Sequence, residues 1–135
     1  SGHYDGTIFH RVIGNFMIQG GGMTPEMAQK PTRAPIPLES RNGLTNLRGS
    51  VAMARTNDPN SASAQFFINV KDNAFLNFRS PDPQGYGYTV FGKVVEGMDV
   101  VNKIAVTPTG AGGPFPKDVP VEKIIVNKAF VVETK

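Results

Sequence analysis

The chain has 135 residues, 39% of them hydrophobic and 19% charged, which is enough to bury one core, and we expect a single domain over residues 1–135. Its 14 basic and 11 acidic residues give a net charge of +3 and are scattered along the sequence, so a nucleic-acid partner is not expected. The absence of cysteine excludes disulfides, thiolate metal sites and a cysteine nucleophile.

The first predicted element is a β-hairpin. Side chains alternate between the two faces of a strand, so in the extended residues 7–13 Arg11 lies on one face and His10 on the other. Residues 14–15, Gly-Asn, form a turn signal, and the apolar run that follows leads into Gln19. The hairpin would therefore bring one cation and one amide together among Phe and Met side chains.

Short strands and one helix are predicted after the hairpin. Alternating apolar and aromatic residues indicate strands over residues 49–55, 64–70 and 88–95. Apolar residues at helical spacing predict a helix of about two turns over residues 98–105. The β-branched residues of 121–132 predict a closing strand.

Loops are predicted to take up much of the remaining chain. The 15 glycines and 11 prolines leave little room for long helices. Clusters of glycine, proline and other turn residues predict loops over residues 20–42, 71–87 and 107–120. We find no internal repeat and no domain boundary.

The sequence carries no signal for a membrane or for export. No apolar run approaches the roughly 18 residues that span a bilayer, and the chain does not begin with a charged and then apolar leader. We therefore expect a cytoplasmic monomer with no membrane partner. The alternative is a periplasmic location, which requires a signal peptide ahead of residue 1.

Spacing alone leaves the roles of the hairpin residues open. An arginine on a half-buried strand usually packs its stem on apolar neighbours and keeps its tip in solvent, which is the simplest interpretation of Arg11. Gln19 is compatible with an ordinary polar residue at a strand end. Four apolar residues on predicted strands or loops are each typical of a plain core: Phe16, Met17, Phe67 and Leu76.

A family resemblance changes this interpretation. Residues 9–22, FHRVIGNFMIQGGG, resemble the signature of the cyclophilins, which are peptidyl-prolyl cis-trans isomerases: Phe-His-Arg, two apolar residues, two turn residues, Phe-Met, any residue and Gln-Gly-Gly. Every position matches. Blocks similar to the rest of the family pattern follow in family order over residues 49–70, 75–76, 88–94 and 96–100. Nearly the whole chain is covered, and its spacing is most similar to the bacterial branch.

The resemblance implies a mostly β fold, an antiparallel cyclophilin-like β-barrel with one or two short helices. Cyclophilins normally carry two strands and a helix ahead of the segment with which this chain begins. We therefore expect the N-terminal strands to be missing from this chain. In a closed barrel, missing strands leave unpaired edges.

The resemblance also implies a mechanism. Rotation about an Xaa-Pro bond has a barrier of about 18–20 kcal/mol and breaks no bond, so it needs a shaped pocket and a donor, and no metal or other cofactor is expected. Arg11 is implied to donate a hydrogen bond to the prolyl nitrogen of the twisted amide, for which its permanent charge and rigid fork are suited. Gln19 would orient Arg11 and hold a substrate carbonyl, and Phe16 completes the implied catalytic set.

The implied substrate-binding residues are Met17, Ala54, Arg55, Thr56, Gln65, Phe67, Phe75, Leu76 and Tyr88. Apolar members of this set would hold the proline ring, and Gln65 would hydrogen-bond the peptide. Arg55 and Thr56 stand where eukaryotic members commonly have Asn-Ala, so they are expected to act mainly through their main chain. Phe75 replaces a common tryptophan and Tyr88 a histidine, which implies weak binding of cyclosporin at most.

We therefore predict a peptidyl-prolyl cis-trans isomerase that acts on proline-containing unfolded or partly folded polypeptides and assists their folding. The alternative is a proline-peptide binding or scaffold module with little turnover, which needs the apolar pocket but not Arg11 and Gln19 in register. The scattered charge disfavours a third possibility, an RNA-associated protein. His3 and His10 have no clustered acidic partner, so neither a zinc site nor a serine triad is expected.

Overall fold

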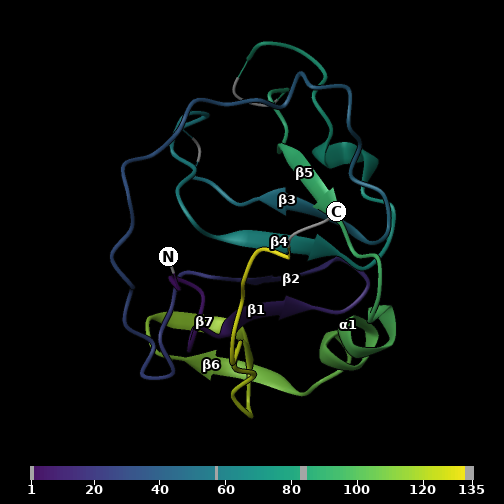
Figure 1. Cartoon of the computed structure of the whole chain (residues 1–135). Coiled ribbons are helices and arrows are strands. Elements are labelled where there is room, and N and C mark those ends of the chain that lie inside the picture. The colour runs from purple at the N-terminus through teal and green to yellow at the C-terminus, as the bar shows by residue number, and fades with distance from the viewer. Residues whose placement is uncertain (1, 57, 83–84, 133–135) are drawn as a thin grey trace.

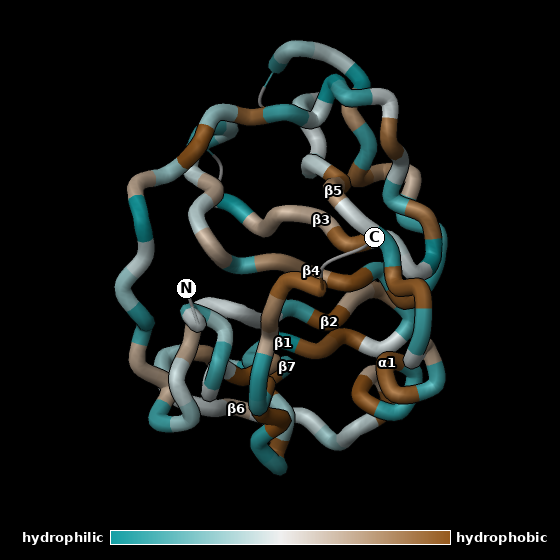
Figure 2. The backbone as a smooth tube through the Cα atoms, viewed as in Figure 1, coloured by the Kyte–Doolittle hydropathy of each residue, from teal (hydrophilic) through white to brown (hydrophobic). Residues whose placement is uncertain are grey.

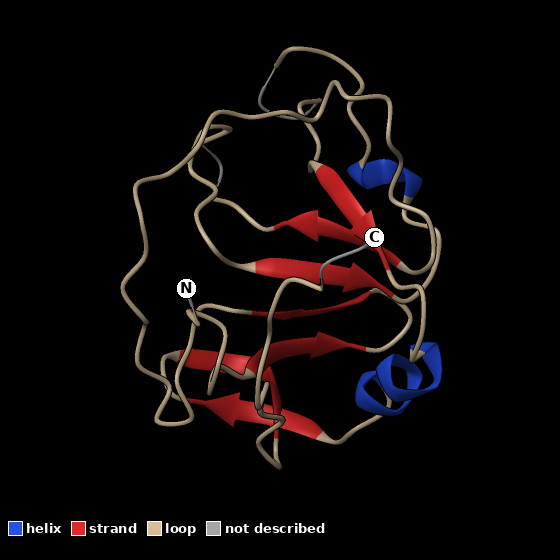
Figure 3. Ribbon diagram, viewed as in Figure 1, coloured by secondary structure: helices blue, strands red, loops and turns tan. Residues whose placement is uncertain are grey.

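The computed structural model describes residues 2–56, 58–82 and 85–132 (Figure 1). Along this part of the chain, the elements are β1 (Phe9–Ile13), β2 (Met17–Gly20), β3 (Ser50–Met53), β4 (Phe66–Asn69), the 3-10 helix η1 (Ala74–Leu76), β5 (Val90–Lys93), α1 (Met98–Ala105), β6 (Thr109–Gly112) and β7 (Phe115–Pro120). Strands predominate over helices (Figure 3), and the paired strands run antiparallel. Among the described residues, no helix is long and apolar enough to cross a membrane.

Five strands form one sheet in the order β1-β2-β4-β3-β5. The predicted hairpin is confirmed as β1 and β2, which are joined by a turn in which Asn15 has a φ of 63°. Asparagine adopts this left-handed conformation more readily than most residues because its short polar side chain can hydrogen-bond locally. The register places Arg11 opposite Gln19.

The two faces of this sheet bury different apolar clusters. On one face, Val12 and Ile18 are 2% and 0% exposed, and they pack against Val101 of α1. The second cluster contains Met17, Ala52, Phe67, Leu76 and Val90. Figure 2 shows hydrophobic residues along β1, β2 and β4 and on α1. Because neighbouring side chains of a strand point to opposite faces, β2 contributes Met17 to one cluster and Ile18 to the other.

Most of the predicted elements before residue 107 are confirmed, with shorter strands. β3, β4 and β5 lie inside the three predicted strand ranges, and α1 has the predicted bounds. The predicted loop over residues 20–42 is confirmed from residue 21 onward, where the chain contains isolated bridges and no strand. The described part of residues 71–87 is irregular apart from η1.

The prediction of a loop over residues 107–120 is wrong. This segment forms the β6-β7 hairpin, in which Gly110 lies opposite Val119 and Gly112 opposite Phe115. Glycine and proline are uncommon inside central strands, but a two-stranded ribbon at the margin of a sheet tolerates both. The hairpin lies beside β1 (Figure 1), where the Phe115 ring centroid is 5.4 Å from that of His10. A long-range contact with β1 therefore stabilises the β6-β7 hairpin, which the local composition does not predict.

The predicted closing strand over residues 121–132 is also wrong for most of its length. It meets the start of β1 through one bridge, between Ile8 and Ile125, with main-chain hydrogen bonds from Phe9 and to Thr7. Further along, Val131 is 90% exposed. A β-branched sequence forms a strand only where a second strand pairs with it, and within the described ranges no strand pairs with the chain beyond this bridge.

His10 lies on the face of β1 opposite Arg11, as the alternation predicts. It is 3% exposed, and its Nδ1 atom has no hydrogen-bond partner among the described residues. The ring packs against Phe115, and Nδ1 makes no hydrogen bond within the described part of the chain. Burial, and to a lesser degree the charge of Arg11, lower the pKa of His10 from 6.5 to about 4.

This pKa predicts a loss of stability in mild acid. Between about pH 6.5 and pH 4 the unfolded chain binds a proton at His10 that the folded chain does not bind, so the free energy of unfolding falls as the pH falls. The contribution approaches about 1.4 kcal/mol per pH unit, the value for one proton. Urea titrations at pH 7, 6 and 5 give the free energy of unfolding at each pH. In the His10→Gln variant, this free energy should fall less steeply between pH 7 and pH 5 than in the parent protein. An equal dependence of the free energy of unfolding on pH in the two proteins would contradict the prediction.

Candidate active site

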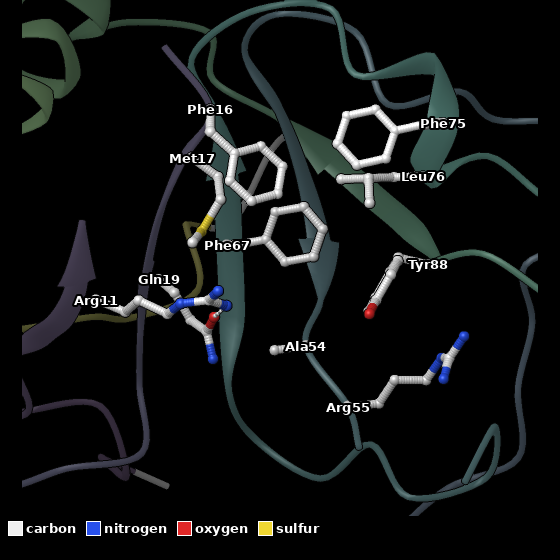
Figure 4. A pocket seen from close by; sticks show the side chains of 10 residues that line it. All are labelled: Arg11, Phe16, Met17, Gln19, Ala54, Arg55, Phe67, Phe75, Leu76 and Tyr88. Atoms are coloured by element: carbon white, nitrogen blue, oxygen red, sulfur yellow. Dashed lines mark hydrogen bonds between the residues drawn. The ribbon is translucent and has the colours of Figure 1, made fainter. Parts of the chain in front are cut away.

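Most of the residues singled out from the sequence surround one cavity of about 280 Å³ (Figure 4). Its lining consists of Arg11, Phe16, Met17, Gln19, Ala54, Arg55, Phe67, Phe75, Leu76 and Tyr88. They come from β1, the β1-β2 turn, β2, β4 and η1, and from the segments that follow β3 and precede β5. The remaining two candidates, Thr56 and Gln65, do not line the cavity but contact residues that do.

The polar side of the cavity is a chain of three side chains. Arg11 Nη1 donates to Gln19 Oε1 at 3.4 Å, and Gln19 Nε2 donates to Gln65 Oε1 at 2.9 Å. Gln19 therefore offers its carbonyl to Arg11 and commits one amide proton to Gln65, which leaves its second amide proton for a ligand. Gln65 itself lies close to Gly22, where a Cβ atom would come within 2.5 Å of the Gln65 side chain. A glycine at position 22 thus leaves the space in which Gln65 can reach Gln19.

The apolar side of the cavity is built from packed rings and aliphatic side chains. Met17, Phe67 and Leu76 are 2%, 4% and 7% exposed and belong to the core cluster beneath the cavity. The rings of Phe16 and Phe75 stack with centroids 5.7 Å apart, and Figure 4 shows them on the same side of the cavity. An apolar floor fixed by core packing suits a small apolar ring and excludes water from it.

Arg55 closes another part of the rim through its side chain. Its Nε and Nη2 atoms donate to the Gly87 carbonyl at 3.1 and 2.6 Å, and Nη1 donates to the Thr56 carbonyl at 2.8 Å. The guanidinium also lies 4.6 Å from the centroid of the Tyr88 ring. Tyr88 in turn meets Phe67 edge-on, with centroids 5.6 Å apart. The sequence offered no signal for this role, because the partner carbonyl lies 32 positions away in an irregular segment.

Thr56 turns away from the cavity into the loop that follows β3. Its main-chain N–H donates to Ser61 Oγ at 3.0 Å, and its Oγ1 donates to the same atom at 2.8 Å. Its carbonyl accepts the hydrogen bond from Arg55. Thr56 therefore anchors the loop and, through its carbonyl, the guanidinium of Arg55.

The charge of the cavity lining is positive. Two of the ten lining residues, Arg11 and Arg55, are cations, and none is acidic. With both guanidinium groups beside an apolar floor, the site favours a ligand that combines hydrogen-bond acceptors with an apolar ring. A proline-containing peptide meets this description, because its carbonyl groups are acceptors and its proline side chain is an apolar ring.

Comparison with known proteins gives the family. The model for "Cyclophilin type peptidyl-prolyl cis-trans isomerase/CLD" matches residues 1–131. The chain belongs to the cyclophilin family. It is 61% identical over 132 residues to peptidyl-prolyl cis-trans isomerase cyp18 of Streptomyces antibioticus, a match that covers 98% of this chain and 79% of that relative. It is 58% identical over 132 residues to peptidyl-prolyl cis-trans isomerase B of Escherichia coli, with 98% and 80% covered.

A solved cyclophilin structure supports the same conclusion at the level of the fold. The crystal structure of a Cryptosporidium parvum cyclophilin type peptidyl-prolyl cis-trans isomerase in the presence of the dipeptide Ala-Pro matches with a TM-score of 0.71 and 27% identity. The match covers 98% of this chain and 78% of that one. The predicted cyclophilin-like β-barrel fold is thereby confirmed. The chain is a cyclophilin whose activity is peptidyl-prolyl cis-trans isomerisation, as predicted.

The geometry of Arg55 predicts a change in substrate binding on replacement by lysine. Arg55→Lys keeps a positive charge but cannot make two bonds to the Gly87 carbonyl while lying over the Tyr88 ring. An exposed cation–π contact contributes about 0.5–1 kcal/mol, so KM for a proline-containing peptide should rise about two- to fivefold with kcat little changed.

Arg41→Lys is the matched control for this measurement. Arg41 also lies over an aromatic ring, 4.8 Å from the centroid of Phe78, but it does not line the cavity. Its variant should keep the parent KM. An equal rise in KM for both variants, or none for Arg55→Lys, would show that the rim contact does not contribute to substrate binding.

Proposed function

We propose that Arg11 is the catalytic residue of this isomerase and that Gln19 and Phe16 act with it. One observation carries the proposal: the Arg11 guanidinium projects over an apolar cavity while Gln19 Oε1 accepts a hydrogen bond from its Nη1 (Figure 4). A donor is thus held at the edge of a pocket of suitable size for a proline ring. No nucleophile is required, because isomerisation neither makes nor breaks a covalent bond.

The chemistry follows from what changes during rotation about the Xaa-Pro bond. The planar amide delocalises the lone pair of its nitrogen, which then cannot accept a hydrogen bond. At the twisted transition state the nitrogen becomes pyramidal and accepts one, so a donor aimed at it binds the twisted form better than either planar form. The Arg11 fork, oriented by Gln19, is positioned to supply this hydrogen bond without reorganising during the reaction.

The proposed substrate is a proline-containing segment of an unfolded or partly folded polypeptide. Its proline ring would enter between Phe16, Met17, Phe67 and Leu76, and its main chain would pass Ala54, whose small side chain permits close approach. Gln65 would donate through its amide, since its Oε1 atom already accepts from Gln19. The related Cryptosporidium parvum cyclophilin was crystallised in the presence of Ala-Pro, which supports this substrate class.

The remaining members of the set would shape the rim. Tyr88, backed by Arg55, offers one hydroxyl at the edge of the cavity, and Thr56 acts indirectly through the carbonyl that holds Arg55. Phe75 is 60% exposed and presents no hydrogen-bond donor. We therefore propose that cyclosporin binds weakly at most, while binding of short prolyl peptides is retained.

The catalytic role predicts a large loss of activity in Arg11→Ala. Removal of one preorganised donor typically costs about 10²- to 10³-fold in rate, and we expect a loss of this size in kcat for a prolyl peptide. Because Arg11 is exposed, the thermal unfolding curve should change little. Arg48→Ala, which removes another exposed arginine outside this cavity, should keep the parent turnover. Near-normal turnover by Arg11→Ala would refute the assignment.

A further inference from the structure

Three completely buried asparagines bond to one another. Asn46, Asn69 and Asn73 are each 0% exposed. Asn69 Nδ2 donates to Asn46 Oδ1 at 3.0 Å, and Asn73 Nδ2 donates to Asn69 Oδ1 at 2.8 Å. Ser50 Oγ joins them by accepting a hydrogen bond from Asn69 Nδ2 at 2.8 Å. We call Asn46, Asn69 and Asn73 the asparagine cluster.

The outer ends of the asparagine cluster bind the main chain of residues that line the cavity. Asn73 Nδ2 donates to the Phe16 carbonyl at 2.9 Å. Asn46 Nδ2 donates to the Leu76 carbonyl at 3.1 Å and to the Tyr88 carbonyl at 3.4 Å. The cluster therefore connects three walls of the cavity that belong to the β1-β2 turn, to η1 and to the segment before β5.

Regular strand pairing does not fix these three walls relative to one another. All three residues lie outside the paired strands: Phe16 is in the β1-β2 turn, Leu76 in η1 and Tyr88 in the irregular segment before β5. A main-chain hydrogen bond from Tyr88 to the Leu76 carbonyl links two of the walls. The Phe16 carbonyl accepts from Val70, which belongs to neither of the other two walls. The asparagine cluster links all three walls through buried hydrogen bonds. Water cannot reach these groups, so a lost hydrogen bond is not replaced by one to solvent.

The amide group suits this position for a chemical reason. Both amide protons of Asn73 are used, one on the Phe16 carbonyl and one on Asn69 Oδ1. Asn69 differs from Asn73, because it both accepts at Oδ1 and donates at Nδ2. A carboxylate at position 73 would face two acceptors without a proton to donate, and a serine would be too short to bridge both.

We propose that the asparagine cluster positions the walls of the proline pocket and thereby sets the affinity for substrate. Asn46 and Asn73 are positioning residues in this account, since they reach the substrate only through Phe16, Leu76 and Tyr88. The inference rests on the proposed function of the cavity. Neither asparagine bonds to Arg11. Disruption of the cluster should therefore lower the affinity for the proline ring, while the rate of the twisting step changes less.

Kinetics of Asn46→Ala provide the first test. Measured below its unfolding transition, this variant should raise KM for a prolyl peptide about five- to tenfold, the effect of about one lost net hydrogen bond, and change kcat less than about twofold. Asn102→Asp, which alters an exposed asparagine on α1, should change neither constant. A folded Asn46→Ala protein with the parent KM would overturn the proposal.

Side-chain amide NMR on the unaltered protein decides the question even if Asn46→Ala does not fold. On titration with an Ala-Pro peptide, the side-chain amide signals of Asn46 and Asn73 should shift together with the Leu76 methyl signals. Shifts of the Leu76 methyls without any change at the two asparagines would overturn this inference but keep the pocket. Shifts at none of these groups would refute the pocket itself.

Discussion

The pairing of β1 with β2 is the constraint on which the rest of the site depends. It places Arg11 opposite Gln19 on one face of the sheet, and the same register buries Val12 and Ile18 beneath α1 on the other. Because side chains alternate, a shift by one residue would exchange the two faces. The core packing on one side therefore holds the guanidinium over the cavity on the other.

Amide side chains connect the other parts of the site. Gln19 and Gln65 lead from Arg11 to the start of β4, and the asparagine cluster leads from the β1-β2 turn to the two segments around Leu76 and Tyr88. An amide side chain carries both a donor and an acceptor but no charge, so a chain of amides can cross between loops without leaving a charge buried. An isomerase needs such rigidity because its catalysis consists of fitting the twisted amide better than the planar one.

Local patterns predicted the parts of the structure that local interactions determine. The alternation in residues 7–13 with the Gly-Asn turn gave the register of the first hairpin, and helical spacing gave the bounds of α1. The β6-β7 hairpin was missed because its glycines and prolines are typical of loops, whereas its structure depends on packing against β1. The asparagine cluster was missed because a buried asparagine has the same sequence signal as one in a turn. The cavity residues were gathered by family resemblance, since spacing alone indicated plain core.

The most direct test of this account measures cis-trans interconversion on the enzyme itself. Exchange NMR on a bound Ala-Pro peptide separates the twisting step from binding, and Arg11→Lys keeps a positive charge but removes the rigid fork that Gln19 orients. The account predicts that the interconversion rate falls at least about tenfold while the dissociation constant changes little. Interconversion at the parent rate would show that charge alone is sufficient, and that the oriented guanidinium is not the catalytic element.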